Sequence, residues 1–214
     1  MRFPRSLIAA CAALLPGLAA AHPHVFVSAE IEVIYAEGRP VAVEVAWIYD
    51  DFFSLLITSD LGIDDDGDLQ LTPAEEAVLA EAVTDWPADF EGDLWLTQGE
   101  DALTLGPRED HRMEFRDGLV HELHRRPITD GGAGPLEVAV YDPFYFVAYD
   151  VTDASVAGRA DCEAAILRAD LAAANAMVED LIGRPAAEVG PDEEMPRVGH
   201  AFADRITVTC ASDS

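Results

Sequence analysis

The sequence predicts an α+β protein: a mostly antiparallel β-sheet or sandwich with an inserted EF-hand-like helix-loop-helix and one later helix. Segments with apolar side chains at every second position recur along most of the chain, and this period is typical of half-buried strands. Turn residues separate them; Asp117-Gly118, for example, is typical of a two-residue hairpin loop. An aspartate-rich loop between two helical stretches interrupts the strands, which indicates an insertion over residues 49–87.

The expected strands begin with a hairpin, in which Gly38-Arg39-Pro40 joins residues 25–36 to residues 41–48. Further strands are expected over residues 93–97, 102–105, 111–116, 119–125, 136–141, 144–151, 162–168 and 203–210. Helices are expected on either side of the acidic loop, over residues 52–61 and 73–84, and again over residues 170–182. The last helix has Asp170 as its N-cap and Gly183 just past its end.

The charge of the chain restricts its partners. The 214 residues include 13 Lys+Arg against 41 Asp+Glu, which gives a net charge of −28. Such a charge repels phosphate backbones and anionic membrane surfaces, so we expect no nucleic-acid partner. A hydrophobic content of 50% is ample for a core, and the length suits one domain.

The first 21 residues have the pattern of an export signal. Arg2 and Arg5 form a basic start, residues 7–18 are mostly apolar, and Ala19-Ala20-Ala21 offers small residues for cleavage near Ala20 or Ala21. No other stretch approaches the roughly 18 apolar residues that a membrane span needs. We therefore expect a periplasmic domain over residues 22–214 without stable membrane insertion.

Residues 64–75 have the spacing of a twelve-residue calcium loop. Positions 1, 3, 5, 7, 9 and 12 are occupied by Asp64, Asp66, Asp68, Gln70, Thr72 and Glu75, and all six can supply oxygen ligands. Position 6 departs from the pattern, because Leu69 stands where the sharp turn favours glycine. The alternative interpretation is a helix start, with Thr72 and Glu75 forming a capping box. Calcium at this loop would be structural.

His22 and His24 stand at the expected start of the mature chain. Two imidazoles near a free amine suit zinc, nickel or cobalt. Pro23 has no amide hydrogen, so the square-planar amino-terminal chelate is blocked and partners from elsewhere would be needed. The alternative is a polar lead-in to the first strand.

His111 and His124 form a second candidate pair. The Asp117-Gly118 turn sets a register that places His111 opposite His124, and opposed residues have Cβ atoms about 4.5–5.5 Å apart. Two imidazoles at that separation can share one transition-metal ion, and surface pairing or a pH-responsive contact is the alternative. His121 lies at an odd offset from His124 and is expected to face the other side.

Removal of the signal leaves two cysteines, Cys162 and Cys210. In an exported protein a disulfide between them is expected, with metal ligation as the alternative.

Four segments resemble one known family: Ala-His-Pro-His-Val-Phe at residues 21–26, the acidic loop, Tyr-Asp-Pro-Phe-Tyr at residues 141–145 with the Ala-Tyr-Asp that follows, and residues 202–210. This is the exported bacterial family known as domain of unknown function 1007. The resemblance implies a periplasmic component of a metal-transport system, with a membrane permease or ABC-type transporter as partner. Only His22, His24 and the acidic loop map onto its motifs.

The sequence thus favours a non-enzymatic accessory protein that binds or delivers zinc, nickel or cobalt. A metal-independent module that docks a permease is the alternative. The chain contains no Gly-x-Ser-x-Gly elbow, His-Glu-x-x-His helix or phosphate loop, so an enzyme would require a hydrolytic site assembled from scattered His and Asp residues.

Overall fold

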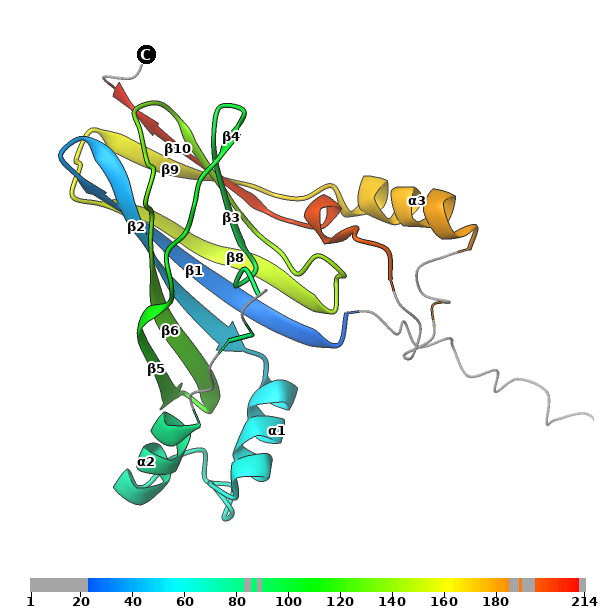
Figure 1. Cartoon of the computed structure of the whole chain (residues 1–214). Helices are drawn as coiled ribbons and strands as arrows, with labels where there is room; N and C mark the ends of the chain where they lie inside the picture. The colour runs from blue at the N-terminus through cyan, green and yellow to red at the C-terminus, as the bar shows by residue number, and fades with distance from the viewer. Residues whose placement is uncertain (1–22, 83–85, 88–89, 185–188, 190–194, 212–214) are drawn as a thin grey trace, which may run out of the picture.

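The computed structural model of the protein describes residues 23–82, 86–87, 90–184, 189 and 195–211. Two five-stranded sheets contain all of the named strands. Sheet A has, in spatial order, β5 (Glu109–Arg116), β6 (Leu119–Pro127), β2 (Arg39–Tyr49), β1 (Val25–Ala36) and β8 (Val147–Ala157). Sheet B has β4 (Asp101–Ala102), β3 (Leu94–Gln98), β7 (Leu136–Val140), β10 (Arg205–Cys210) and β9 (Cys162–Leu167). Figure 1 shows the arrangement.

The strand pairs are antiparallel except for β1 and β8, which run parallel. The expected α+β class with mostly antiparallel strands is therefore confirmed. The sheets share one core, because alternate side chains of β1 point toward sheet B and are buried, among them Val27, Ile31 and Val33. Their counterparts in sheet B include Leu136 and Ile206. Burial of each such side chain stabilises the fold by about 1.5–3 kcal/mol.

The insertion contains two helices, α1 (Asp51–Leu61) and α2 (Pro73–Glu81). They lie beyond one end of sheet A, next to the β5–β6 hairpin (Figure 1). Asp50 caps α1, and Ile63 and Leu79 pack with Val120 of β6 in a small separate core. The backbone N–H of Val120 also donates to Ser54 Oγ at 3.0 Å, which fixes α1 against the sheet.

The third helix, α3 (Leu171–Ile182), has Asp170 as its N-cap and Gly183 in the left-handed region at its end, as expected. Its buried residues Ala174 and Val178 pack with Val198 and Phe202 around the short 3-10 helix Gly199–Ala201. None of the helices in the described residues has both the length and the hydropathy that crossing a bilayer requires.

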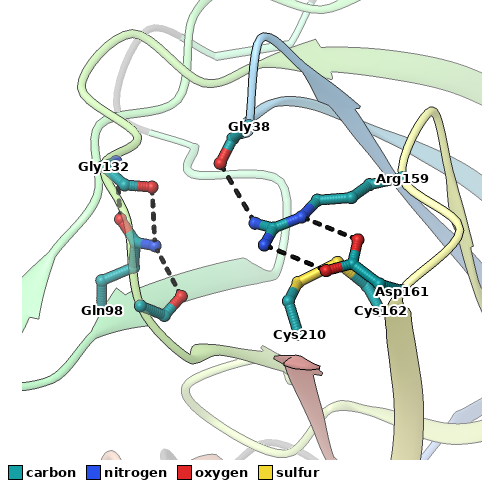
Figure 2. The surroundings of a disulfide bond; sticks show 8 residues. Gly38, Gln98, Gly132, Arg159, Asp161, Cys162 and Cys210 are labelled. Carbon is teal, nitrogen blue, oxygen red and sulfur yellow. Dashed lines mark hydrogen bonds and ion pairs between the residues drawn. A yellow bond between two sulfur atoms is a disulfide. The ribbon is translucent and has the colours of Figure 1, made fainter. Parts of the chain in front are cut away.

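The disulfide between Cys162 and Cys210 is present and joins directly paired positions of β9 and β10. Figure 2 shows it beside Asp161, whose carboxylate accepts hydrogen bonds from Arg159; that guanidinium also donates to the carbonyl of Gly38. Closing a chain segment of 48 residues stabilises the fold by about 4 kcal/mol in the chain-entropy model.

Most boundaries lie within two residues of the expected ones, and three elements differ by more. Helix α2 ends at Glu81 rather than at residue 84, although residues 83–85 lie outside the described part. Strand β4 is only Asp101–Ala102, and Leu105 forms an isolated bridge with Ile128.

The third difference concerns β8, which spans Val147–Ala157 instead of residues 144–151. The Asp142 carboxylate accepts hydrogen bonds from the backbone N–H groups of Phe144, Phe146 and Val147, and this local capture holds the chain in a turn. Phe144 and Phe146 are consequently exposed by 45% and 48%.

Candidate functional site

Strand β6 carries an unusual series of inward-facing side chains. Val120 is followed by Glu122, His124 and Arg126 at alternate positions, and these three polar residues are only 7%, 3% and 5% exposed. Buried ionisable groups need partners, because removing a charge from water costs several kcal/mol. The inward face of β6 is therefore a candidate functional site.

Glu122 is the centre of this cluster. Its Oε2 accepts a hydrogen bond from the Tyr49 hydroxyl at 2.7 Å, and its Oε1 accepts one from Arg108 Nη1 at 2.9 Å. Oε1 also lies 2.8 Å from Nε2 of His111. Burial raises the pKa of Tyr49, and the Glu122 carboxylate raises it further. The hydroxyl therefore remains protonated and continues to donate.

The contacts of His111 determine which ring nitrogen carries the proton. Nε2 lies 2.8 Å from the Glu122 carboxylate and 3.1 Å from Arg108 Nη1, and only the first contact needs a proton on Nε2. The carboxylate contact is shorter, and Nη1 already donates to Glu122, so we assign the proton to Nε2. The buried Nδ1 then has a lone pair, and it has no hydrogen-bond partner among the described residues.

His124 is the most deeply buried polar residue of the cluster. Neither ring nitrogen has a hydrogen-bond partner among the described residues. The ring lies edge-on to Trp47 and Trp86, at centroid separations of 4.8 and 5.1 Å. Burial lowers the pKa of His124 to about 3, and the positive charges of Arg108 and Arg126 act in the same direction. The ring is neutral at physiological pH, which is the form that binds metals.

The two imidazoles are neighbours, as the hairpin register predicts. Their ring centroids are 6.4 Å apart and the rings are nearly perpendicular. The register shifts between Glu109 and Arg112, where Asp110 has a φ of 51°, so the pairing is irregular at His111 itself. Two rings bonded to one ion at about 2.0–2.1 Å would have centroids roughly 5–6 Å apart, so a small side-chain movement would complete the geometry.

His24 lies far from this pair. His124 pairs with Val45, which pairs with Ile31, and Ile31 is seven residues beyond His24 along the chain. At about 3.3 Å per residue the offset along the sheet is about 23 Å. The ring of His24 instead packs on Phe146, at a centroid separation of 4.6 Å. The structure does not bring His24 together with His111 or His124, and His22 lies outside the described residues.

The acidic loop brings three of its predicted ligands together. Asp64, Asp66 and Asp68 each offer a carboxylate oxygen within 4.8 Å of the other two. Leu69 adopts a φ of 60°, so the sharp turn forms despite the absence of glycine, and its N–H donates to Asp64 Oδ1 at 3.2 Å. Leu69 adopts this conformation at a cost in strain, and the hydrogen bond to Asp64 helps to hold it.

Glu75 belongs to a different set of contacts. Its Oε1 accepts from the N–H of Asp64 at 3.0 Å, and its Oε2 accepts from the N–H and hydroxyl of Thr72 at 2.8 and 2.7 Å. This is the expected capping box at the start of α2. The hydrogen bonds from Thr72 and then from Asp64 lower the pKa of Glu75. Gln70 donates its N–H to Asp68 Oδ1 within the same loop.

A cavity of about 600 Å³ lies beside the polar cluster, and the sequence analysis did not predict it. Trp47, Tyr49 and Glu122 face it from sheet A, and Asp93 and Trp95 from the start of β3. Sequence reasoning also missed Glu122, Tyr49 and Arg108. The signal that could have found Glu122 was the alternation of residues 119–127, which places position 122 on the same face as His124.

These features define the class of protein: a two-sheet α+β fold with a helical insertion and a polar cluster enclosed next to an aromatic cavity. The chain belongs to the family described as "Protein of unknown function (DUF1007)", which it matches over residues 7–210. This confirms the resemblance seen in its motifs. A comparison with curated proteins finds no match.

Proposed function

We propose that the protein is an exported, non-enzymatic accessory protein of a membrane transporter, which binds zinc, nickel or cobalt between His111 and His124 and delivers it. One observation carries the proposal: Nδ1 of His111 and both nitrogens of His124 are buried and have no hydrogen-bond partner among the described residues. An unsatisfied buried polar group costs about 1–3 kcal/mol. A bound ion would use the lone pairs and offset that cost.

Glu122 supports this assignment as an outer partner. A metal-bound histidine usually donates its other ring N–H to a carboxylate, which fixes the tautomer and orients the ring. Nε2 of His111 has that contact with Glu122 at 2.8 Å, and Nδ1 is left to bind the ion. The bound ion would supply Lewis acidity and charge, and the chain would supply two neutral nitrogens in a fixed orientation.

Delivery rather than permanent storage fits a site with few ligands. Structural zinc sites have four protein ligands, whereas two histidines leave the other positions to water or to a receiving protein. Arg108 and Arg126 both lie near His124, and their positive charges lower the affinity for a dication. Both properties favour exchange of the ion.

The location and the partner rest on the sequence. The pattern of residues 1–21 favours export to the periplasm, and the family resemblance implies a metal permease or ABC-type transporter. The surface charge of this chain would attract cations toward it.

We also propose that the acidic loop is EF-hand-like and binds calcium as a structural ion. The convergence of Asp64, Asp66 and Asp68 supports this, together with the positive φ of Leu69 at position 6. Gln70 would contribute its backbone carbonyl at position 7 of the loop, and Thr72 would supply the calcium ligand at position 9. Glu75 would have to leave its contacts with Thr72 and Asp64 to become the bidentate ligand.

A second candidate function is a metal-independent module that docks a permease. Helix α1 favours it, because Phe52, Leu55 and Leu56 form an apolar stripe that is 72%, 62% and 43% exposed. In that case a photo-crosslinker at residue 55 would trap the permease equally well with and without metal. Metal-dependent crosslinking would favour the delivery function instead.

Calorimetry on the metal-stripped mature protein tests the main proposal, with zinc, nickel, cobalt and calcium titrated separately. We expect one zinc or nickel equivalent, and affinity at least 100-fold weaker in His111→Ala and His124→Leu. His121→Ala is the matched control, because His121 lies on the same strand with its ring near Arg116 on the other face. Loss of binding in a His22/His24 double variant, with His111→Ala unchanged, would overturn the ligand assignment. Absence of any transition-metal binding would overturn the function.

A further inference from the structure

The cavity beside the polar cluster has aromatic walls. All three tryptophans of the chain, Trp47, Trp86 and Trp95, line its volume of about 600 Å³, and Tyr149 and Phe146 add two more rings. Ligand pockets in proteins have volumes of about 300–1,000 Å³. The cavity is therefore large enough for a small organic molecule.

The charges that line the cavity are mostly negative. Of the described residues that line it, Glu91, Asp93, Glu122 and Asp142 are acidic and Arg197 is basic. Two of these carboxylates have partners of their own: Glu122 pairs with Arg108, and Asp142 accepts backbone hydrogen bonds.

Asp93 differs from the other carboxylates. It is 5% exposed, and its carboxylate accepts a hydrogen bond from the Tyr149 hydroxyl at 2.8 Å. No cationic side chain among the described residues forms an ion pair with it. Burial raises the pKa of Asp93 to about 7, against the opposing effect of the Tyr149 hydrogen bond. A buried carboxylate without a cationic partner, in an aromatic cavity, can act as the counter-ion of a bound cation.

The backbone fixes the position of this carboxylate. Asp93 has a φ of 51°, and its carbonyl accepts from the N–H of Tyr141 at 2.9 Å. Trp95, two residues further along, donates from Nε1 to the carbonyl of Tyr141 and stacks on that ring at a centroid separation of 5.0 Å. The acid and one aromatic wall therefore belong to one rigid unit.

We propose that this cavity binds a small organic ammonium ion, with Asp93 as its counter-ion and the rings of Trp47, Trp95 and Tyr149 around its alkyl groups. Aromatic faces attract cations, and a desolvated contact of this kind contributes strongly to binding. A hydrated metal dication would not fit as well, because apolar rings cannot replace its water ligands. An organic ammonium ion has alkyl surface for the rings and one charge for one carboxylate.

The site goes beyond the proposed metal function and does not depend on it. The two sites are neighbours, because the ring of Trp47 lines the cavity and also contacts His124. Variants of His111 or His124 test metal binding, and a variant of Asp93 tests binding of the ammonium ion.

Choline and its neutral isostere 3,3-dimethylbutan-1-ol are the probes, titrated into the mature chain at constant ionic strength. The three tryptophans that line the cavity supply a fluorescence signal, and calorimetry supplies the affinity. We expect saturable choline binding that is at least 10-fold tighter than binding of the isostere. Equal affinity for the two probes, or no saturable signal, would overturn the proposal. This result needs only the natural protein.

Asp93→Asn provides the second measurement. Asparagine tolerates a positive φ and keeps an acceptor for Tyr149, so the fold is preserved while the charge is removed. We expect choline affinity to fall at least 10-fold in this variant. Asp101→Asn, at an exposed position of sheet B, is the matched control for the general negative charge of the chain and should bind as the natural protein does. A similar loss in both variants would show nonspecific attraction and reject the site.

Discussion

Oε1 of Glu122 lies 2.8 Å from Nε2 of His111, across the β5–β6 pair, and this contact leaves the buried Nδ1 of His111 with its lone pair. The same oxygen accepts from Arg108, so the carboxylate is held from several sides. Glu122 thus fixes the ring of His111, whose centroid lies 6.4 Å from that of His124.

Replacement of Glu122 by Gln should weaken zinc or nickel binding about 10- to 100-fold, because the carboxylate that fixes the ring of His111 is lost. Glutamine keeps the side-chain volume and one acceptor oxygen, for either the Tyr49 hydroxyl or Arg108, so the fold should persist. Calorimetry measures the affinity, with Glu114→Gln as the control on the exposed side of the same hairpin. Unchanged affinity in Glu122→Gln would mean that Glu122 does not position His111 for metal binding.

His124→Leu should have opposite effects on stability and on binding. In the metal-free protein, leucine removes two buried nitrogens that lack partners, so the free energy of unfolding should rise by about 1 kcal/mol. The added stability that zinc gives to the natural protein should disappear. Urea unfolding with and without zinc measures both effects. A variant that is destabilised without metal and equally stabilised by zinc would identify His124 as a packing residue only.

The fold was largely predictable because its strands alternate regularly and its turns have recognisable residues. The hairpin around Gly38, the Asp117-Gly118 turn and the Asp170 cap all lie as predicted. The parallel pairing of β1 with β8 was not predictable, since the two strands are more than 100 residues apart and local pattern does not specify a distant partner. Asp142 delays the start of β8 through side-chain hydrogen bonds, which the spacing of apolar residues does not reveal.

The candidate site was predicted only in part. The turn register brought His111 to His124, because hairpin geometry is local. The contribution of Glu122 and Arg108 to the site depends on which face of β6 is buried. Packing against sheet B decides which face this is. Prediction of the cavity around Asp93 would have required the relative positions of β3, β8 and the aromatic residues. No single segment of the sequence encodes these positions.

Leu69→Gly should relieve strain in the metal-free and the calcium-bound loop alike, so the calcium affinity should change less than about 3-fold. Leucine at a φ of 60° is strained by about 1–2 kcal/mol, and glycine adopts this conformation without that cost. Leu69 is 59% exposed, so little packing is lost. Calcium titration by calorimetry measures the change, with Asp51→Asn outside the loop as the control. A glycine variant that binds no calcium would show that the loop serves only to join α1 and α2.

Asp93→Asn should stabilise the protein at high pH and leave it unchanged in acid. The folded-state pKa of Asp93 is raised to about 7, against 3.8 ordinarily, so below about pH 4 both states are protonated and the charge has no cost. Between pH 4 and 7 the unfolded chain loses the proton first, and stability falls as pH rises. Above pH 7 the natural protein carries a buried charge that costs on the order of 2–4 kcal/mol.

The measurement is the difference in free energy of unfolding between Asp93→Asn and the natural protein, taken at pH 4 and pH 8 so that other titrating groups cancel. We expect the difference to approach zero at pH 4 and to reach its maximum at pH 8, with no such change for Asp101→Asn. Choline should reduce the advantage of the variant at pH 8, because it stabilises only the natural protein. A difference that does not vary with pH would mean that Asp93 is charged without cost, and the cavity would then need no cation.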